Sequence, residues 1–259
     1  MAGNIDNTKI HVGTGRLWLN VCAPGPGRRL VIDANGTPQV NSWALNTQVG
    51  AGYQIIDSNG NTQEAITSGQ TGGSQPTWGT TYGSQVTDGG VTWQLQALSP
   101  SYVFVGATEG VINLSVAPKN TPVVADQATA PIDAFLSAEV ESIEATLLQT
   151  DLNNLRNFIT QGTYSSGTDT ALPSGAQAYE MIAFGGVLTV PKISVALISP
   201  RRDVTSKYVV AQLYRAFQAD AVALGFTRTK ETVTKVRFDG LWDDFRVSGD
   251  RVGQLWRQT

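Results

Sequence analysis

The chain has 259 residues and a formal net charge of −3, and 15% of its residues are charged, against about 25% in an average soluble domain. The negative balance excludes a strongly basic nucleic-acid reader, because such proteins present clustered Lys and Arg to phosphates. The low charge content is typical of a surface that copies of the same chain cover. A high content of Gly, Ser, Thr, Asn and Gln would also explain it.

The chain has one cysteine, Cys22, and one histidine, His11. Cys22 has no partner for an intrachain disulfide, and we expect it to be a small buried residue. Any histidine-based triad or histidine-rich metal site would have to centre on His11 in the polar N-terminal arm. We therefore expect no metal and no cofactor.

Targeting signals are the next class that the sequence excludes. The segment MAGNIDNTK lacks the basic stretch followed by an apolar core that marks a secretory signal. No run approaches the ~18 consecutive apolar residues of a membrane span. We expect synthesis in a bacterial cytoplasm and no membrane partner.

Three zones of composition follow one another along the chain. The middle zone, residues 38–98, contains no Lys or Arg, and its aromatic residues alternate with turn pairs such as NG and DGG. Its only acids are Asp57, Glu64 and Asp88. This shift predicts a small all-β domain of residues 38–98, inserted into a discontinuous domain of residues 1–37 and 99–259.

The last zone is rich in short extended runs, but two segments have ambiguous periodicity. Residues 207–218 place the same apolar side chains on one face of a helix or of a strand. From Pro131 onward the local spacing favours one long helix, because apolar residues recur every three to five positions. These residues are Ile132, Leu136, Val140, Ile143, Leu147, Leu152, Leu155 and Ile159.

No catalytic motif survives inspection. The chain has no Gly-x-Ser-x-Gly elbow, P-loop or His-Glu-x-x-His motif. Gly13 and Gly15 lack the third glycine of a nucleotide-binding glycine motif. Acid pairs occur at Glu139/Glu141 and Asp243/Asp244, and paired carboxylates can cleave glycosides. Such neighbours also arise by chance among 21 acids, so we interpret them as solvated surface and expect no enzyme.

Residues 106–159 carry a resemblance to a known family. An extended run at 110–116 is followed by a polar loop, then by VVADQ…PIDAFL and an acidic-apolar stretch that ends in LLQTDLNNL. This stretch resembles the tail tube (major tail) proteins of long-tailed bacteriophages, and the closing TVTKVRFDGLW is similar to the family's last long strand. The resemblance implies that residues 132–148 are extended and that only residues 151–159 are helical, with Thr150 as their cap.

The resemblance implies a mainly-β fold and a structural role. The expected fold is a tail-tube-type β-sandwich or barrel subunit with a short flanking α-helix, plus the small all-β inserted domain. Six copies would form a ring, and stacked rings would form the virion's tail tube, which conducts double-stranded DNA during genome ejection. A mildly acidic conduit suits this role, because few cations hold the passing phosphates. The length and the insert favour a flexible, non-contractile tail.

The implied partners are copies of this chain and other tail proteins: the tape measure, terminator and distal tail proteins. In the family the strand equivalent to residues 132–148 lines the channel. Glu139 and Glu141 would share one face of that strand and are the channel-facing candidates, whereas Glu144 would point the opposite way.

The inserted zone has its own pattern: NSW, GSQPTW and GTTYGSQVTDGGVTW. It is similar to a small β-module that recurs in phage virion proteins, with one extra glycine, Gly90, and more loosely to small chitin-binding modules. Trp43 and Tyr53 are the candidates for contact with host-surface glycans. Trp78 and Trp93 are expected in the core, because a module of about 60 residues needs large aromatics to build one.

Two other functions stay open at this point. A tail terminator or head–tail completion protein would form a single ring, and copy number per virion separates it from a tube protein. A carbohydrate-binding accessory protein would bind glycans through the inserted domain and would not polymerise.

Overall fold

Strands dominate the computed structural model, which confirms the mainly-β class. It describes residues 15–98, 103–124, 129–148, 152–155, 162–170, 175–185, 190, 192–201, 204, 206–221 and 233–259. His11 lies outside these residues. Cys22 is buried, as expected, and burial raises the pKa of its thiol to about 12.

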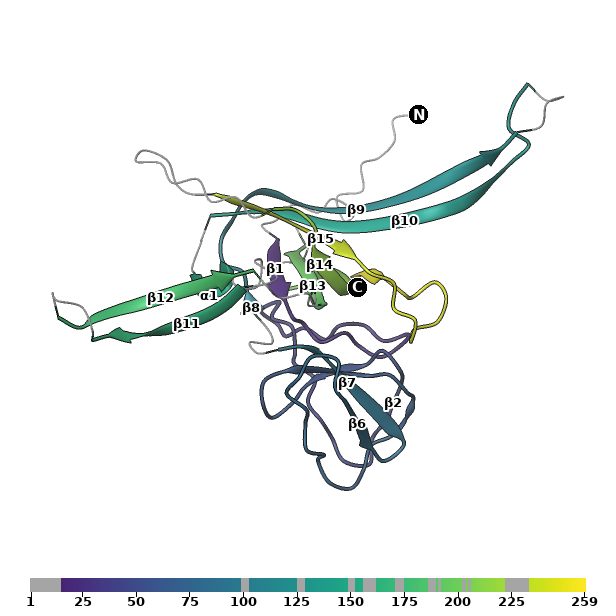
Figure 1. The fold of residues 1–259 in the computed structure, drawn as a ribbon. Coiled ribbons are helices and arrows are strands. Elements are labelled where there is room, and N and C mark those ends of the chain that lie inside the picture. Colours follow the sequence, from purple (N-terminus) through teal and green to yellow (C-terminus); the bar gives the residue numbers. More distant parts are fainter. Residues whose placement is uncertain are drawn as a thin grey trace.

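Eight of the described strands form one antiparallel sheet, with strand order β8-β1-β13-β14-β15-β10-β9 and β16 paired to β14 (Figure 1). Its strands are β1 (Arg16–Leu19), β8 (Val103–Phe104), β9 (Thr108–Val123), β10 (Asp133–Leu147), β13 (Ile193–Pro200), β14 (Tyr208–Gln218), β15 (Thr234–Gly240) and β16 (Gly253–Arg257). Strand β14 pairs with β16 along its first half and with β15 at its end. The sheet divides at this strand.

The main core lies between two parts of this sheet. Ile143 of β10 and Phe238 of β15 pack with Leu17 of β1 and Leu213 of β14, and all four are buried. Trp18, which follows Leu17 along β1, packs instead in a second cluster with Ile198, Val210 and Leu30. Since successive strand residues point to opposite faces, the central strands are covered on both sides.

The strand at residues 133–147 confirms the extended conformation that the resemblance implies, and the helical interpretation of the local spacing is wrong. β10 pairs with β9 on one side and with β15 on the other. Inward residues alternate at Ile143, Ala145 and Leu147, and ladder pairing overrides a weak local preference. Residues 208–218 are likewise a strand, which resolves the second ambiguous segment.

The predicted flanking helix falls mostly outside the described residues. One helical turn, α1 (Leu152–Leu155), is described, and Leu155 packs into the main core. Residues 151 and 156–159 are not among the described residues, so a longer helix stays a prediction. No helix in the described part of the chain is long and apolar enough to cross a membrane.

The strands within residues 38–98 pair only with one another. They form a two-stranded sheet of β2 (Gln48–Val49) and β5 (Gly69–Gln70), and a four-stranded sheet in the order β3-β4-β7-β6. The latter strands are β3 (Gln54–Ile56), β4 (Thr62–Ala65), β6 (Gln85–Asp88) and β7 (Val91–Ala97). Trp78 and Trp93 are 6% and 1% exposed, which confirms their predicted core positions.

The extra glycine of this module lies in the β6–β7 turn. Asp88 pairs with Val91, so Gly89 and Gly90 form the whole loop, and Gly89 has φ 60°. Positive φ is what such tight hairpin turns require. A Cβ on Gly89 would also meet the Gln70 carbonyl at 2.6 Å, so this turn needs glycine for space as well as for conformation.

Candidate functional site

The β9–β10 hairpin extends far beyond the core that its base covers (Figure 1). Every described residue from Val116 to the tip and back to Glu139 is exposed. We call residues 116–124 and 129–139 the distal hairpin. The eight strand residues from Val116 to Val123 span roughly 26 Å. A two-stranded ribbon with no third strand is at best marginally stable in water. The distal hairpin therefore needs a further surface to pack against.

The side chains of the distal hairpin are apolar enough to bind such a surface. Phe135 and Leu136 are each 56% exposed and, as neighbours on β10, point to opposite faces. The other exposed apolar residues are Val116, Val123, Val124 and Ile132. Exposed apolar side chains on both faces of one projecting ribbon favour an interaction site there.

The main sheet ends at β9, a strand of 16 residues, on one side and at the two-residue β8 on the other. Long edge strands offer unpaired N–H and C=O groups to another chain. Pro118 and Pro122 lie opposite Glu139 and Ala134, and a proline in a paired strand places its nitrogen on the open side. The prolines therefore limit backbone pairing along the outer part of β9, and side chains must supply contact there.

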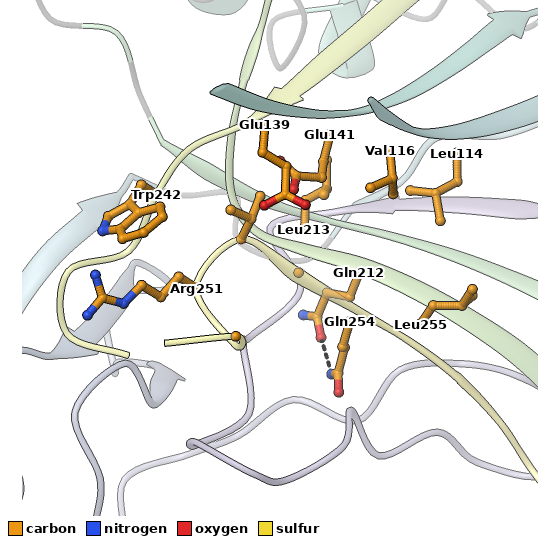
Figure 2. Close-up of a pocket in the computed structure, with 13 residues that line it drawn as sticks. Leu114, Val116, Glu139, Glu141, Gln212, Leu213, Trp242, Arg251, Gln254 and Leu255 are labelled. Carbon is orange, nitrogen blue, oxygen red and sulfur yellow. Dashed lines mark hydrogen bonds between the residues drawn. The ribbon is translucent and has the colours of Figure 1, made fainter. Parts of the chain in front are cut away.

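Glu139 and Glu141 share one face of β10, as the sequence predicts (Figure 2). They line a cavity of about 310 Å³ between the hairpin and the C-terminal segment, together with Leu213, Trp242 and Arg251. This is the face that continues the main core, because Glu141 and the buried Ile143 are two positions apart. Their channel-facing role stays a prediction.

The two carboxylates differ in environment. Glu139 is exposed, whereas Glu141 is 9% exposed. Burial, and then the charge of Glu139, raise the pKa of Glu141. The interpretation of this acid pair as solvated surface is therefore wrong for Glu141.

A buried ion pair joins the inserted module to the body. Glu64 on β4 is 0% exposed, and Arg215 on β14 donates to its Oε2 from Nε at 3.0 Å and from Nη2 at 2.7 Å. Asp243 Oδ1 lies 3.7 Å from Arg215 Nη1. The surface-acid interpretation is wrong for Asp243 too, since it is 0% exposed, whereas Asp244 is exposed.

A second buried arginine extends this contact. The Nε of Arg246 lies 3.2 Å from Asp243 Oδ2, and its Nη2 donates to the Gly52 carbonyl of the module at 2.8 Å and to the Pro24 carbonyl. Its guanidinium carbon also lies 3.6 Å from the Tyr214 ring centroid. Two arginines of the body thus hold the module through hydrogen bonds shielded from water. The sequence analysis identified neither arginine; the one available signal was that residues 38–98 contain three acids and no Lys or Arg to pair with them.

The pH dependence of stability should report on Glu64. Burial raises its pKa to about 7, with Asp243 adding to the rise and Arg215 opposing it, while Tyr82 also faces it. The folded chain then holds this proton more tightly than the unfolded chain, so the free energy of unfolding falls as pH rises from about 4.5 to about 7. Between pH 5 and pH 8 the wild type should lose roughly 2–3 kcal/mol more than Glu64→Gln.

Urea unfolding of the two proteins at both pH values, at a concentration where the chain is monomeric, measures this difference. The other titrating groups contribute equally to the pH dependence of both proteins, so their contributions cancel in the difference. Equal losses in the two proteins would contradict the raised pKa of Glu64.

All three acids of the module are turned inward, so its surface carries no formal charge. Asp57, Glu64 and Asp88 are 6%, 0% and 4% exposed, and residues 38–98 contain no Lys or Arg. Asp57 Oδ1 accepts backbone N–H groups of its own turn. Asp88 accepts the indole N–H of Trp43 at 2.7 Å and of Trp93 at 3.1 Å.

The two candidate glycan-contact aromatics are half-buried. Trp43 and Tyr53 pack against the module core, and the Trp43 indole N–H is already bonded to Asp88. A flat, open aromatic platform would need more exposure than this. Sugar contact by these residues stays a prediction.

Within the described ranges, no group of three or more His, Cys, Asp or Glu side chains could hold a metal ion. No protein-family model matches the chain, and no curated protein is significantly similar to it.

Proposed function

We propose that this chain is a structural subunit that assembles into stacked hexameric rings, forming a phage tail tube that conducts DNA. The observation that carries the proposal is the distal hairpin: a long edge ribbon with no core of its own and apolar side chains on both faces. A second copy packed against it would cover those side chains and the edge of the sheet. In a closed ring, the distal hairpin of every copy would be covered by a neighbouring copy in the same way.

Ring closure also suggests which groups face the channel. The main core covers one face of β10 and β15, so in the proposed ring the other face would line the lumen. That face carries Glu144, Arg237 and Asp239, with Arg237 Nε 2.8 Å from Asp239 Oδ1. Glu139 stays in the proposal because the distal hairpin is open on both faces, whereas Glu141 would reach a channel only if the C-terminal segment moved.

The formal charge supports a conduit. Six copies carry 6 × −3 = −18, and an excess of negative charge limits adhesion of phosphates. The inserted module would decorate the outside, since Figure 1 shows it below β1, β13 and β14, with β9 and β10 above these strands. The proposed partners are further copies, the other tail proteins and passing DNA, all within a virion.

Sedimentation velocity tests the proposal. A ring of six has a mass of 6 × 27.6 kDa, or about 166 kDa, and a tube protein should give an open-ended series of larger particles as concentration rises. Arrest at a single ring would instead favour a terminator or completion protein. A monomer at every concentration would contradict both assemblies.

The uncharged module surface suits a neutral partner such as a host-surface glycan. Binding through amides and hydroxyls, without ions, should not change with salt. Retention on neutral polysaccharide that persists at high salt would support this secondary role, and retention that salt abolishes would contradict it.

A further inference from the structure

The second projecting hairpin is acidic. Strands β11 (Gly162–Asp169) and β12 (Gln177–Phe184) pair only with each other among the described strands. Residues 162–185 contain Asp169 and Glu180 and no Lys or Arg, and both acids are exposed. Tyr179, Met181 and Phe184 are 44%, 49% and 77% exposed, so the hairpin combines negative charge with apolar surface.

A basic groove lies elsewhere on the body, beside the last residues of the chain. Its open volume is about 740 Å³, and Arg28, Arg29 and Lys207 line it with no Asp or Glu side chain among them. Trp256 forms part of its wall, 5.9 Å from the Arg29 guanidinium, and Val31 is 60% exposed there. The groove thus combines positive charge with apolar surface.

The two features match in charge and in apolar character but do not meet within one chain. Figure 1 shows the β11–β12 hairpin projecting away from the body, whereas the C-terminal end lies across the central strands from it. We propose that the acidic β11–β12 hairpin of one copy docks in the basic groove of the next. The proposal rests on the self-assembly proposed above and names one of its contacts.

Such a contact is head-to-tail, because two different patches of the same chain meet. Head-to-tail contacts propagate into rings or filaments rather than stopping at a dimer. Charge complementarity also fixes the partner and the register, since like charges brought together repel. The contact between the basic groove and the β11–β12 hairpin therefore sets the head-to-tail orientation of neighbouring copies. The distal hairpin contributes the apolar contact area.

Charge reversal with mixing tests this contact. One variant carries Asp169→Lys and Glu180→Lys, and the other carries Arg29→Glu and Lys207→Glu. Each alone should associate at least about 100-fold more weakly than wild type, because each copy then repels its own kind. An equimolar mixture should recover assembly in sedimentation velocity, because each hairpin meets a groove of opposite sign. Circular dichroism checks that both variants fold.

The control and the outcomes separate this contact from assembly in general. Asp220→Lys with Asp244→Lys changes the net charge as much as the first variant, at exposed acids outside both patches and outside β9 and β10, and should assemble as wild type does. Assembly of both reversal variants on their own would overturn the docking proposal and leave the tube proposal standing. Two folded variants that fail to recover on mixing would overturn it as well. A wild-type chain that never assembles would refute the tube proposal first.

Discussion

Replacing Phe135 and Leu136 by Asp should abolish assembly without unfolding the chain. Both side chains are 56% exposed on the distal hairpin, outside the described core clusters, so the subunit loses little when they become polar. Packing against a second copy would bury them, at about 1–2 kcal/mol each for the half that is now exposed. Burial of two carboxylates adds a further penalty. The association constant should fall at least about 100-fold.

The matched control places the same change on other exposed apolar residues. Leu45 and Val247 are 60% and 61% exposed, one on the module and one on a loop of the body. The variant Leu45→Asp with Val247→Asp should assemble as wild type does in sedimentation velocity. Wild-type assembly by the Phe135/Leu136 variant would remove the distal hairpin from the interface.

Replacing Arg215 by Met should cost about 3–5 kcal/mol of unfolding free energy at pH 8, because it strands a buried Glu64 carboxylate. The cost should be smaller at pH 5, where Glu64 is protonated in the folded chain. The double variant Glu64→Leu with Arg215→Met removes both partners and should recover most of the loss, since apolar replacements of a buried pair are often neutral. Urea unfolding of the wild type, both single variants and the double variant measures the coupling.

An exposed ion pair provides the comparison for this cycle. Arg237 and Asp239 lie 2.8 Å apart on β15 with partly exposed side chains, and exposed pairs contribute little to stability. Arg237→Met should leave the free energy of unfolding nearly unchanged. Additive single-variant costs at Glu64 and Arg215 would show that the pair does not hold the module to the body.

Composition carried the sequence predictions further than periodicity did. The absence of Lys and Arg from residues 38–98 and the turn glycines within them indicated a small β-module, whose strands do pair among themselves. Trp78 and Trp93 were predictable as core because a small module has few other large side chains. Spacing at Ile132 to Leu147 pointed to a helix, because pairing with β9 and β15 depends on residues that a local window does not contain.

The buried contact of Glu64 with Arg215 and Asp243 could not be predicted from the sequence, for a similar reason. Glu64 and Arg215 are 151 positions apart, and no local pattern distinguishes Arg215 from a surface arginine. Asp243 looked like one of two neighbouring surface acids, yet only Asp244 is exposed. Whether a charged side chain is buried depends on the distant residue that packs against it in the fold. No short sequence motif identifies that residue.

Negative-stain electron microscopy of the purified chain at high concentration tests the central claim most directly. Copies that cover one another's distal hairpins in closed rings should appear as annuli with a stain-filled centre, and as stacks of such annuli, with the module as knobs outside. Uniform single particles of about 28 kDa, with no annuli at any concentration, would contradict the account.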